Sequence, residues 1–249
     1  MNTAVYTAVG GGVLAGGLHA ITGPDHIAAL LPRIMGQSWL SSMGIGAVWG
    51  LGHGFSATML GMGAFFMKER LGTGSGHADW IEKMGTWTEG LIGLSLVAIG
   101  LLGLKESNAL LKEEQAKQAE TAAAGADPSA AAGEGEGESG GPSRWGVTRG
   151  SKRAIFLNGL LHGFSWDGAP SLAPALALTS WRSAAWFLLA YCSGTMAAMS
   201  ATTTIIGEGS VRVGQALDQP DIPRKLSFAS SIVAIVIGVA WMLKAALLS

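Results

Sequence analysis

Charged residues are scarce in this sequence, and cysteine is almost absent. Only 13% of the 249 residues are charged, and Cys192 is the single cysteine. One cysteine excludes disulfides within the chain and a thiolate metal cluster. The net charge of −1 gives no reason to expect a nucleic-acid partner. No Gly-x-x-x-x-Gly-Lys-Ser/Thr segment occurs, so the sequence shows no sign of an ATPase.

Hydrophobic residues, in contrast, make up 49% of the chain and gather in long runs. A run of about 20 apolar residues is long enough to cross a bilayer as a helix. We therefore predict an all-α integral membrane protein with six transmembrane helices. They cover about Ala4–Leu31, Ser41–Met67, Trp87–Leu104, Ala154–Leu178, Ala184–Ile206 and Leu226–Leu248. The start lacks the basic segment of a cleaved signal peptide, so we expect the first span to remain in the mature protein.

A polar segment divides these spans into two groups of three. Residues 1–105 form the first membrane unit, and residues 151–249 form the second. Between them, residues 106–150 are rich in alanine, glycine, serine and glutamate, a composition that cannot bury a core. We expect residues 106–150 to be a disordered acidic linker, with a helical extension of the third span at its start.

Lysine and arginine are concentrated on one side of this predicted topology. The loops after the first, third and fifth spans carry Arg33, Lys105, Lys112, Lys117, Arg144, Arg149, Lys152, Arg153, Arg212, Arg224 and Lys225. The opposite side carries Lys68, Arg70, Lys83, Arg182 and Lys244. By the positive-inside rule, the linker is cytoplasmic and both termini face outward. The preferred location is a bacterial inner membrane, and an organelle envelope is the alternative.

The segment from His19 to His26 is unusual for a membrane span. It places two imidazoles, Asp25 and a Gly-Pro pair within eight residues of the first apolar run. An ionisable residue at membrane depth costs at least about 3 kcal/mol on insertion scales, which favours a functional role. Proline disrupts a continuous helix, so we expect one helix to about Ile21 and another from about Asp25. Carbonyls freed at such a break can face a cation, and Asp25 can instead cap the second helix.

A third intramembrane histidine, His53, lies in Leu51-Gly-His-Gly-Phe-Ser of the second span. A lone buried histidine is more often a packing residue held by hydrogen bonds, but the nearby pair His19 and His26 favours a ligand role. Glu89 lies near the start of the third span, where its side chain can extend to the membrane interface. A ligand role is the alternative for Glu89.

The second half of the chain echoes the first. The fourth span contains His162, then Asp167 five residues later, then a Gly-Ala-Pro break. The second and fifth spans share Ser-x-Thr-Met-x-x-Met, and the third and sixth each end in an apolar run followed by lysine. These matches predict two three-helix repeats, and an odd number of spans inverts the second repeat. His-Gly-Phe-Ser in the second and fourth spans is a competing match. The repeat extends the candidate metal site to His162 and Asp167.

The candidate site residues are imidazoles and carboxylates. This combination suits divalent first-row metals such as Ni, Co, Zn and Fe better than Cu(I). Histidine binds metal only when neutral, so the affinity should fall as the pH drops toward about 6. An inside-negative potential favours uptake of a dication by about 4.6 kcal/mol per 100 mV, twice the value for a single charge.

Two segments resemble signature motifs of the nickel–cobalt transporter superfamily. They are His19-Ala-Ile-Thr-Gly-Pro-Asp-His-Ile27 and Leu51-Gly-His-Gly-Phe-Ser. The similarity is greater to the shorter UreH-like branch, which is associated with urease accessory membrane proteins. The larger nickel permeases have His-x4-Asp-His with an additional acid, whereas this sequence has His-x5-Asp-His without one. The resemblance implies metal-ligand roles for His19, Asp25, His26 and His53.

We therefore predict a secondary transporter that moves a divalent transition-metal ion, with Ni²⁺ preferred, through a His/Asp site at the membrane midplane. The metal is substrate, no permanent cofactor is expected, and the other partner is the lipid bilayer. The alternatives are transport of Fe²⁺, Mn²⁺ or Co²⁺, export, or a membrane assembly factor that holds metal without moving it. Buried polar packing is the simplest alternative. We do not expect an enzyme, because no nucleophile–base pair is evident. The oligomeric state stays open, a homo-oligomer included.

Overall fold

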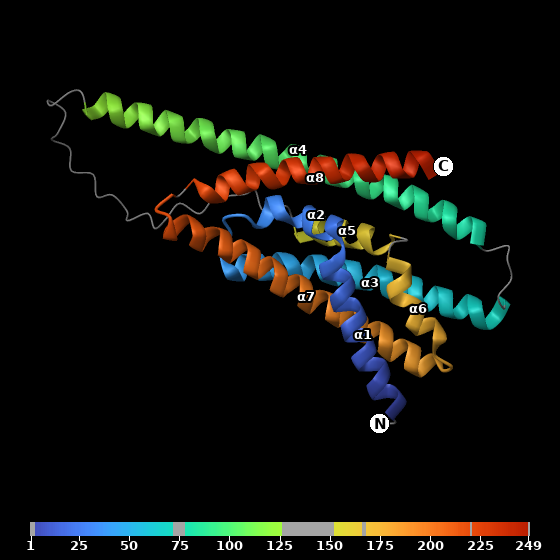
Figure 1. Cartoon of the computed structure of the whole chain (residues 1–249). Helices are drawn as coiled ribbons and strands as arrows, with labels where there is room; N and C mark the ends of the chain where they lie inside the picture. The colour runs from blue at the N-terminus through green and yellow to red at the C-terminus, as the bar shows by residue number, and fades with distance from the viewer. Residues whose placement is uncertain (1–2, 72–77, 126–151, 166–167, 220, 249) are drawn as a thin grey trace.

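The described part of the chain folds almost entirely into helices. The computed structural model describes residues 3–71, 78–125, 152–165, 168–219 and 221–248. Within them the helices are α1 (Thr3–Thr22), α2 (Pro24–Ile34), α3 (Trp39–Leu71), α4 (Ala78–Gly125), α5 (Lys152–Gly163), α6 (Ala169–Ala177), α7 (Trp181–Ala216) and α8 (Ile222–Leu248). The described residues contain no strand, so the predicted all-helical class is confirmed (Figure 1).

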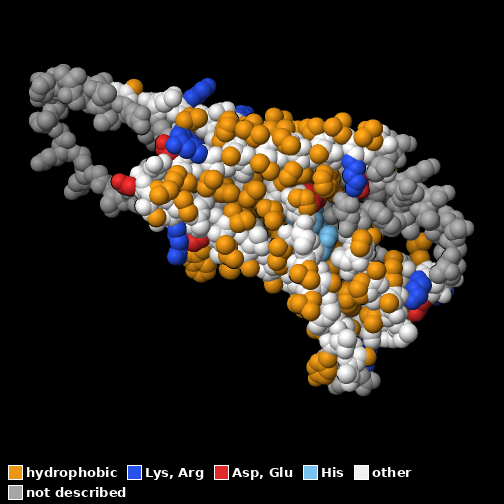
Figure 2. Space-filling view, in the orientation of Figure 1, with side chains coloured by type: hydrophobic (Ala, Val, Ile, Leu, Met, Phe, Trp, Pro, Cys, Tyr) orange, Lys and Arg blue, Asp and Glu red, His pale blue; other side chains and the backbone are white. Residues whose placement is uncertain are grey.

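Four of these helices are long and apolar enough to cross a membrane. The candidate spans are Thr3–Thr22, Thr86–Lys112, Trp181–Ala216 and Ile222–Leu247. Helix α3 has 33 residues, but glycines, serines and His53 lower its hydropathy. Hydrophobic side chains cover the middle of the molecule, and charged side chains gather toward its ends (Figure 2). These features are those of a membrane protein, and the count of six spans stays a prediction.

Two of the predicted spans are each divided into two helices. The break predicted in the first span is confirmed, because α1 ends at Thr22 and α2 begins at Pro24. Proline suits the first position of a helix, since its missing N–H would have no partner there. The fourth predicted span is also divided: α5 ends at Gly163, and α6 begins at Ala169.

Two helices extend well beyond the predicted spans. Helix α4 continues to Gly125, about 20 residues into the segment that we assigned to the disordered linker. Alanine, leucine, lysine, glutamate and glutamine are strong helix formers, so this polar stretch continues the helix outside the apolar region. Helix α7 likewise continues to Ala216. The rest of the linker, residues 126–150, lies outside the described residues.

Glycines allow α1 to pack directly on the backbone of α7. A side chain on Gly12 would collide with the carbonyl group of Phe187, and one on Gly16 would collide with that of Tyr191. The later glycine of α1 contacts the later residue of α7, so α1 and α7 run parallel. Small residues of this kind let backbones approach closely in lipid, where packing stabilises helix association.

Helix α5 contacts α3 in the same manner. Gly159 abuts the carbonyl group of Trp49, and Gly163 abuts that of His53, so α3 and α5 also run parallel. By contrast, α3 and α7 run antiparallel, as do α4 and α8, which lie side by side (Figure 1). The central parts of α1, α3, α5 and α7 therefore meet in one region.

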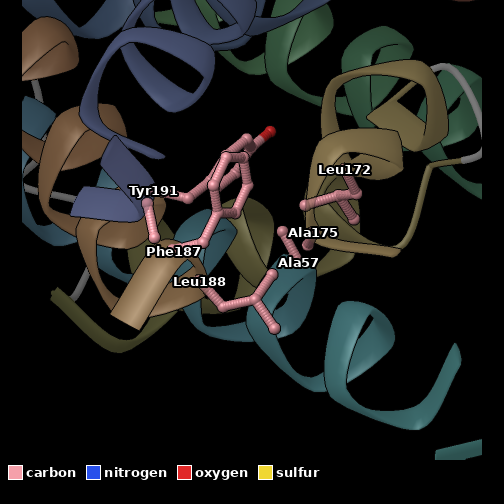
Figure 3. Close-up of a cluster of buried hydrophobic side chains, with 7 residues drawn as sticks. Ala57, Leu172, Ala175, Phe187, Leu188 and Tyr191 are labelled. Carbon is pink, nitrogen blue, oxygen red and sulfur yellow. The ribbon is translucent and has the colours of Figure 1, made fainter. Parts of the chain in front are cut away.

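Two clusters of buried apolar side chains lie on either side of this region. The cluster toward the C-terminal end of α3, which we call the α6-side cluster, is shown in Figure 3 and comprises Ala8, Ala57, Leu172, Ala175, Phe187, Leu188 and Tyr191. The cluster toward the N-terminal end of α3, which we call the α2-side cluster, comprises Ala20, Leu30, Ile34, Trp49, Ile155 and Met199. The candidate ligands lie between the two clusters.

Candidate metal site

The helix break folds the chain back on itself, so that His19 and His26 face each other. His19 lies in the last turn of α1, and His26 lies in the first turn of α2. Their ring centroids are 4.9 Å apart. The chain can make this turn because Gly23 has no side chain; a β-carbon there would lie 2.6 Å from Cε1 of His26. The Gly-Pro pair thus provides both the break and the space for the second imidazole.

Helix α3 adds a third imidazole to this pair. The ring centroid of His53 lies 4.7 Å from that of His26 and 5.3 Å from that of His19. Each of the three histidines offers a ring nitrogen, and these nitrogens all lie within 4.8 Å of one another. Three imidazoles at this separation can close around a single ion with small rotamer changes. His19, His26 and His53 therefore form what we call the histidine cluster.

A backbone carbonyl orients the ring of His26. Its Nδ1 lies 3.3 Å from the carbonyl oxygen of Ala20. Since a carbonyl oxygen only accepts, Nδ1 is the protonated nitrogen, and Nε2 keeps its lone pair. The carbonyl oxygen of Ala20 is thus engaged by His26, and the expectation that carbonyls at the break face a cation stays a prediction. An outer hydrogen bond of this kind fixes the tautomer that a metal ligand requires.

His53 has no such partner. The residue is 1% exposed, and neither of its ring nitrogens has a hydrogen-bond partner among the described residues. Buried polar atoms in proteins are nearly always paired, so an exception calls for a specific explanation. The simple packing role for His53 depended on hydrogen bonds that the described structure does not contain.

Asp25 lies beside the histidine cluster without capping α2. The residue before the helix is Gly23, and no side chain caps this end. Asp25 is 5% exposed, and its Oδ2 lies 3.8 Å from Nε2 of His26. That separation is too long for a hydrogen bond. A cation between the two groups would satisfy both.

His162 comes close to the cluster from α5. It is fully buried, and its ring centroid lies 6.2 Å from that of His26. Nδ1 of His162 donates to the carbonyl oxygen of Asn158 at 2.8 Å, and the buried Nε2 has no partner among the described residues. His162 does not belong to the group of nitrogens within 4.8 Å. The other residue predicted from the repeat, Asp167, lies outside the described residues.

Sequence reasoning missed the side chains that support the histidines. The indole of Trp49 stacks on the ring of His53, with centroids 5.1 Å apart and planes 15° apart. Its Nε1 donates to Oδ1 of Asn158 at 2.8 Å, and the Asn158 amide donates to Ser95 at 3.3 Å. A signal was present: Trp49 precedes His53 by four residues, and Asn158 precedes His162 by four. Residues four apart share one face of a helix.

Glu89 is buried between helices, and its predicted position near the membrane interface stays a prediction. It is 5% exposed, and its Oε1 lies 3.0 Å from Nζ of Lys244 on α8. A buried carboxylate needs such a partner, because desolvation without one is costly. Glu89 is outside the histidine cluster, and its contact with Lys244 links α4 to α8.

Comparison with known proteins gives relatives but no family. The chain is 34% identical over 240 residues to Chloroplast protein FOR GROWTH AND FERTILITY 2 from Arabidopsis thaliana, covering 96% of this chain and 57% of that protein. It is 33% identical over 231 residues to Chloroplast protein FOR GROWTH AND FERTILITY 1 from the same plant, covering 91% of this chain and 56% of that protein. The chain thus spans little more than half the length of these curated relatives. No family model matches it, and no solved structure does.

Proposed function

We propose that the chain is a secondary transporter for a divalent transition-metal ion. The observation that carries this proposal is the histidine cluster, in which ring nitrogens from α1, α2 and α3 lie within 4.8 Å of one another. Imidazoles that serve only as packing groups would have hydrogen-bond partners, and both ring nitrogens of His53 lack them among the described residues. A bound metal ion would give one of these two nitrogens a partner.

The donor set favours particular metals. Three neutral imidazoles with one adjacent carboxylate suit Ni²⁺, Co²⁺, Zn²⁺ and Fe²⁺, and no thiolate is available for Cu(I). The preference for Ni²⁺ rests on the resemblance of the two sequence motifs to the nickel–cobalt transporter superfamily. Fe²⁺, Mn²⁺ or Co²⁺ as substrate, and export in place of uptake, are the alternatives that a flux assay distinguishes.

We also propose that the membrane part consists of six spans in two inverted repeats. The first repeat comprises α1 with α2, then α3 and α4; the second comprises α5 with α6, then α7 and α8. An inverted repeat requires α1 to lie parallel to α7, and α5 to lie parallel to α3. It also requires α3 and α7, and α4 and α8, to pair antiparallel across the pseudo-twofold axis. The glycine contacts of these four helix pairs have those directions and support the proposal.

The relatives favour one of the two predicted locations. Both are named as chloroplast proteins, which supports an organelle envelope over a bacterial inner membrane. The orientation proposed from charge places the ends of α2, α4 and α7 on the side of the basic loops. In either membrane, an inside-negative potential would drive a dication toward that side.

A second candidate function is a membrane factor that holds metal without moving it. The burial of His26 and His53, which are 2% and 1% exposed, favours this alternative. A storage site gains from enclosure, whereas a transporter must expose its ligands in turn. The two functions differ in one measurable property, since only a transporter moves many ions per protein molecule.

The test is flux of radioactive Ni²⁺ into proteoliposomes under an inside-negative potential. We expect saturable, potential-driven flux in the wild type and its loss in His19→Ala and Asp25→Asn. Asp221→Asn is the matched control, because the Asp221 side chain is 45% exposed and pairs with Arg224 away from the cluster. Flux that is unchanged in both test variants would refute the site. Stoichiometric binding without flux would establish the metal-holding factor.

A further inference from the structure

A cavity connects the histidine cluster with one end of the helices. Its volume is about 450 Å³, and its walls are almost entirely apolar. His19, His53 and His162 line its inner part, and Met67 near the end of α3 and Leu176 near the end of α6 line its outer part. The cavity therefore runs from the cluster toward the end of α3 that is followed by the predicted outer loop.

His19 is the histidine of the cluster that this cavity leaves accessible. His26, His53 and His162 are at most 2% exposed, whereas His19 is partly exposed. Histidine atoms reach the surface in the view of Figure 2, in a hollow between hydrophobic side chains. The start of α6 closes on the same ring, because a β-carbon on Gly168 would lie 3.3 Å from Nε2 of His19.

The opposite side of the cluster is closed by packing. There the α2-side cluster fills the space between the histidines and the basic loops, and Leu30, Trp49 and Met199 in it are fully buried. Closer to the basic loops, a hydrogen bond joins α7 to α3: the Thr203 hydroxyl donates to the carbonyl oxygen of Ser42 at 2.8 Å. A second cavity near this end is lined by residues of α3 and α5 and by none of the histidines.

We propose that this structure is the conformation open toward the end of α3, with the cavity as the route by which a cation reaches His19, and with the α2-side cluster as the closed gate. This inference rests on the proposed function, because it gives the transport site one open and one closed side. Alternating access requires such an asymmetry in each conformation. His19 is then the first ligand that an incoming ion contacts, and His53 is a ligand deeper in the site.

The apolar wall is compatible with this role. The described residues that line the cavity include no lysine, arginine, aspartate or glutamate, so none of them would retain a cation by its charge before the ion reaches the histidines. Conduction requires weak interactions along the route and stronger ones at the site. Tyr191, whose hydroxyl lies 2.9 Å from that of Ser171, supplies the polar edge next to the cluster.

Cysteine accessibility tests the inference, since the natural chain has a single cysteine to remove. In a Cys192→Ala background, Ala64→Cys places a thiol in the cavity wall. Ala198→Cys is the matched control, because Ala198 is also a partly buried alanine but packs against the α2-side cluster. Both variants are reconstituted as the full chain in proteoliposomes and treated with a membrane-impermeant, charged thiol reagent, applied from outside or sealed inside.

We expect Ala64→Cys to react from one side only, and at least about tenfold faster than Ala198→Cys, which must wait for an opening fluctuation. Equal rates, or reaction of Ala198→Cys alone, would overturn the inference. Reaction of Ala64→Cys only with an uncharged, lipid-soluble reagent would show that lipid fills the cavity and would overturn it too. Calorimetry with Ni²⁺ on the same preparations separates the two proposals: a one-sided labelling pattern without Ni²⁺ binding would refute the proposed function and leave the accessibility result intact.

Discussion

Replacing His53 by leucine should stabilise the protein while it abolishes metal binding. A neutral imidazole carries one N–H donor and one acceptor nitrogen. At His53 both are buried without a hydrogen-bond partner among the described residues. Leaving a buried polar group unpaired costs about 1–3 kcal/mol, and leucine at the same place requires no partner. A residue that lowers stability in this way is retained for function.

The magnitude follows from the surroundings of the ring. Two unpaired nitrogens cost about 2–6 kcal/mol together, and the ring returns about 0.5–1.5 kcal/mol by stacking on an indole. That indole belongs to Trp49, at a centroid distance of 5.1 Å. The difference between these two ranges is the expected gain, so His53→Leu should raise the free energy of unfolding of the metal-free protein by about 0.5–5.5 kcal/mol. For a chain of this length, each kcal/mol shifts the unfolding temperature by about 2–4 °C.

The assay is thermal unfolding of the purified protein, followed by tryptophan fluorescence with and without Ni²⁺. At a concentration of about 100 times Kd, Ni²⁺ should stabilise the wild type by about 2.7 kcal/mol and His53→Leu not at all. The control is Phe65→Leu on the same helix, since Phe65 is 1% exposed. It should lower stability by about 1 kcal/mol and keep the Ni²⁺ shift. A metal-free His53→Leu that unfolds earlier than the wild type would refute the argument and make His53 a packing residue.

Three further predictions concern the helix contact, the supporting side chains and pH. Gly16→Ala should yield little monodisperse protein on size-exclusion chromatography, because its methyl group collides with the Tyr191 carbonyl, whereas Gly10→Ala, in open space, should stabilise α1 by about 0.5–1 kcal/mol. Trp49→Phe removes the donor to Asn158 and should lower stability by about 1 kcal/mol and weaken Ni²⁺ binding in calorimetry; unchanged binding would contradict its positioning role. Ni²⁺ affinity should fall as the pH is lowered into the acidic range, because protonated imidazole cannot bind metal, and an affinity that rises toward acidic pH would contradict histidine ligands.

The local parts of the site were predictable from sequence. The Gly-Pro pair predicted a helix break, and α1 indeed ends at Thr22 before α2 begins at Pro24. The spacing of His19 and His26 around that break, and the cost of placing them in a membrane, were enough to select both residues. Hydropathy located the apolar parts of the helices but not their ends. It could not show that α4 continues to Gly125, because hydropathy identifies the lipid-facing part and helix propensity decides the rest.

The contacts between distant segments were not predictable in this way. Trp49 and Asn158 are 109 residues apart, and Glu89 and Lys244 are 155 apart. A propensity or a periodicity describes one segment at a time, so it cannot select a partner on another helix. This is why the pairing of Glu89 with Lys244 was not predicted. Trp49 and His53 are four residues apart, as are Asn158 and His162, so each pair lies on one face of its helix. The spacing alone does not show that these two faces contact each other; that follows only from the packing of α3 against α5.

The size of the loss in Ni²⁺ affinity in Asp25→Asn decides whether Asp25 faces the ion or serves only the helix. Asp25 lies in the first turn of α2, where a carboxylate gains about 0.3–1 kcal/mol from the helix dipole. Beside a bound cation it would gain far more, since two unit charges about 4 Å apart interact by about 4 kcal/mol at an effective dielectric constant of 20. Asp25→Asn therefore weakens Ni²⁺ binding by more than about 100-fold if the carboxylate faces the ion, and by less than about tenfold if it serves only the helix. A single carboxylate among neutral imidazoles also neutralises only half of the charge of a dication. The occupied site then keeps a positive charge, and the membrane potential can drive it.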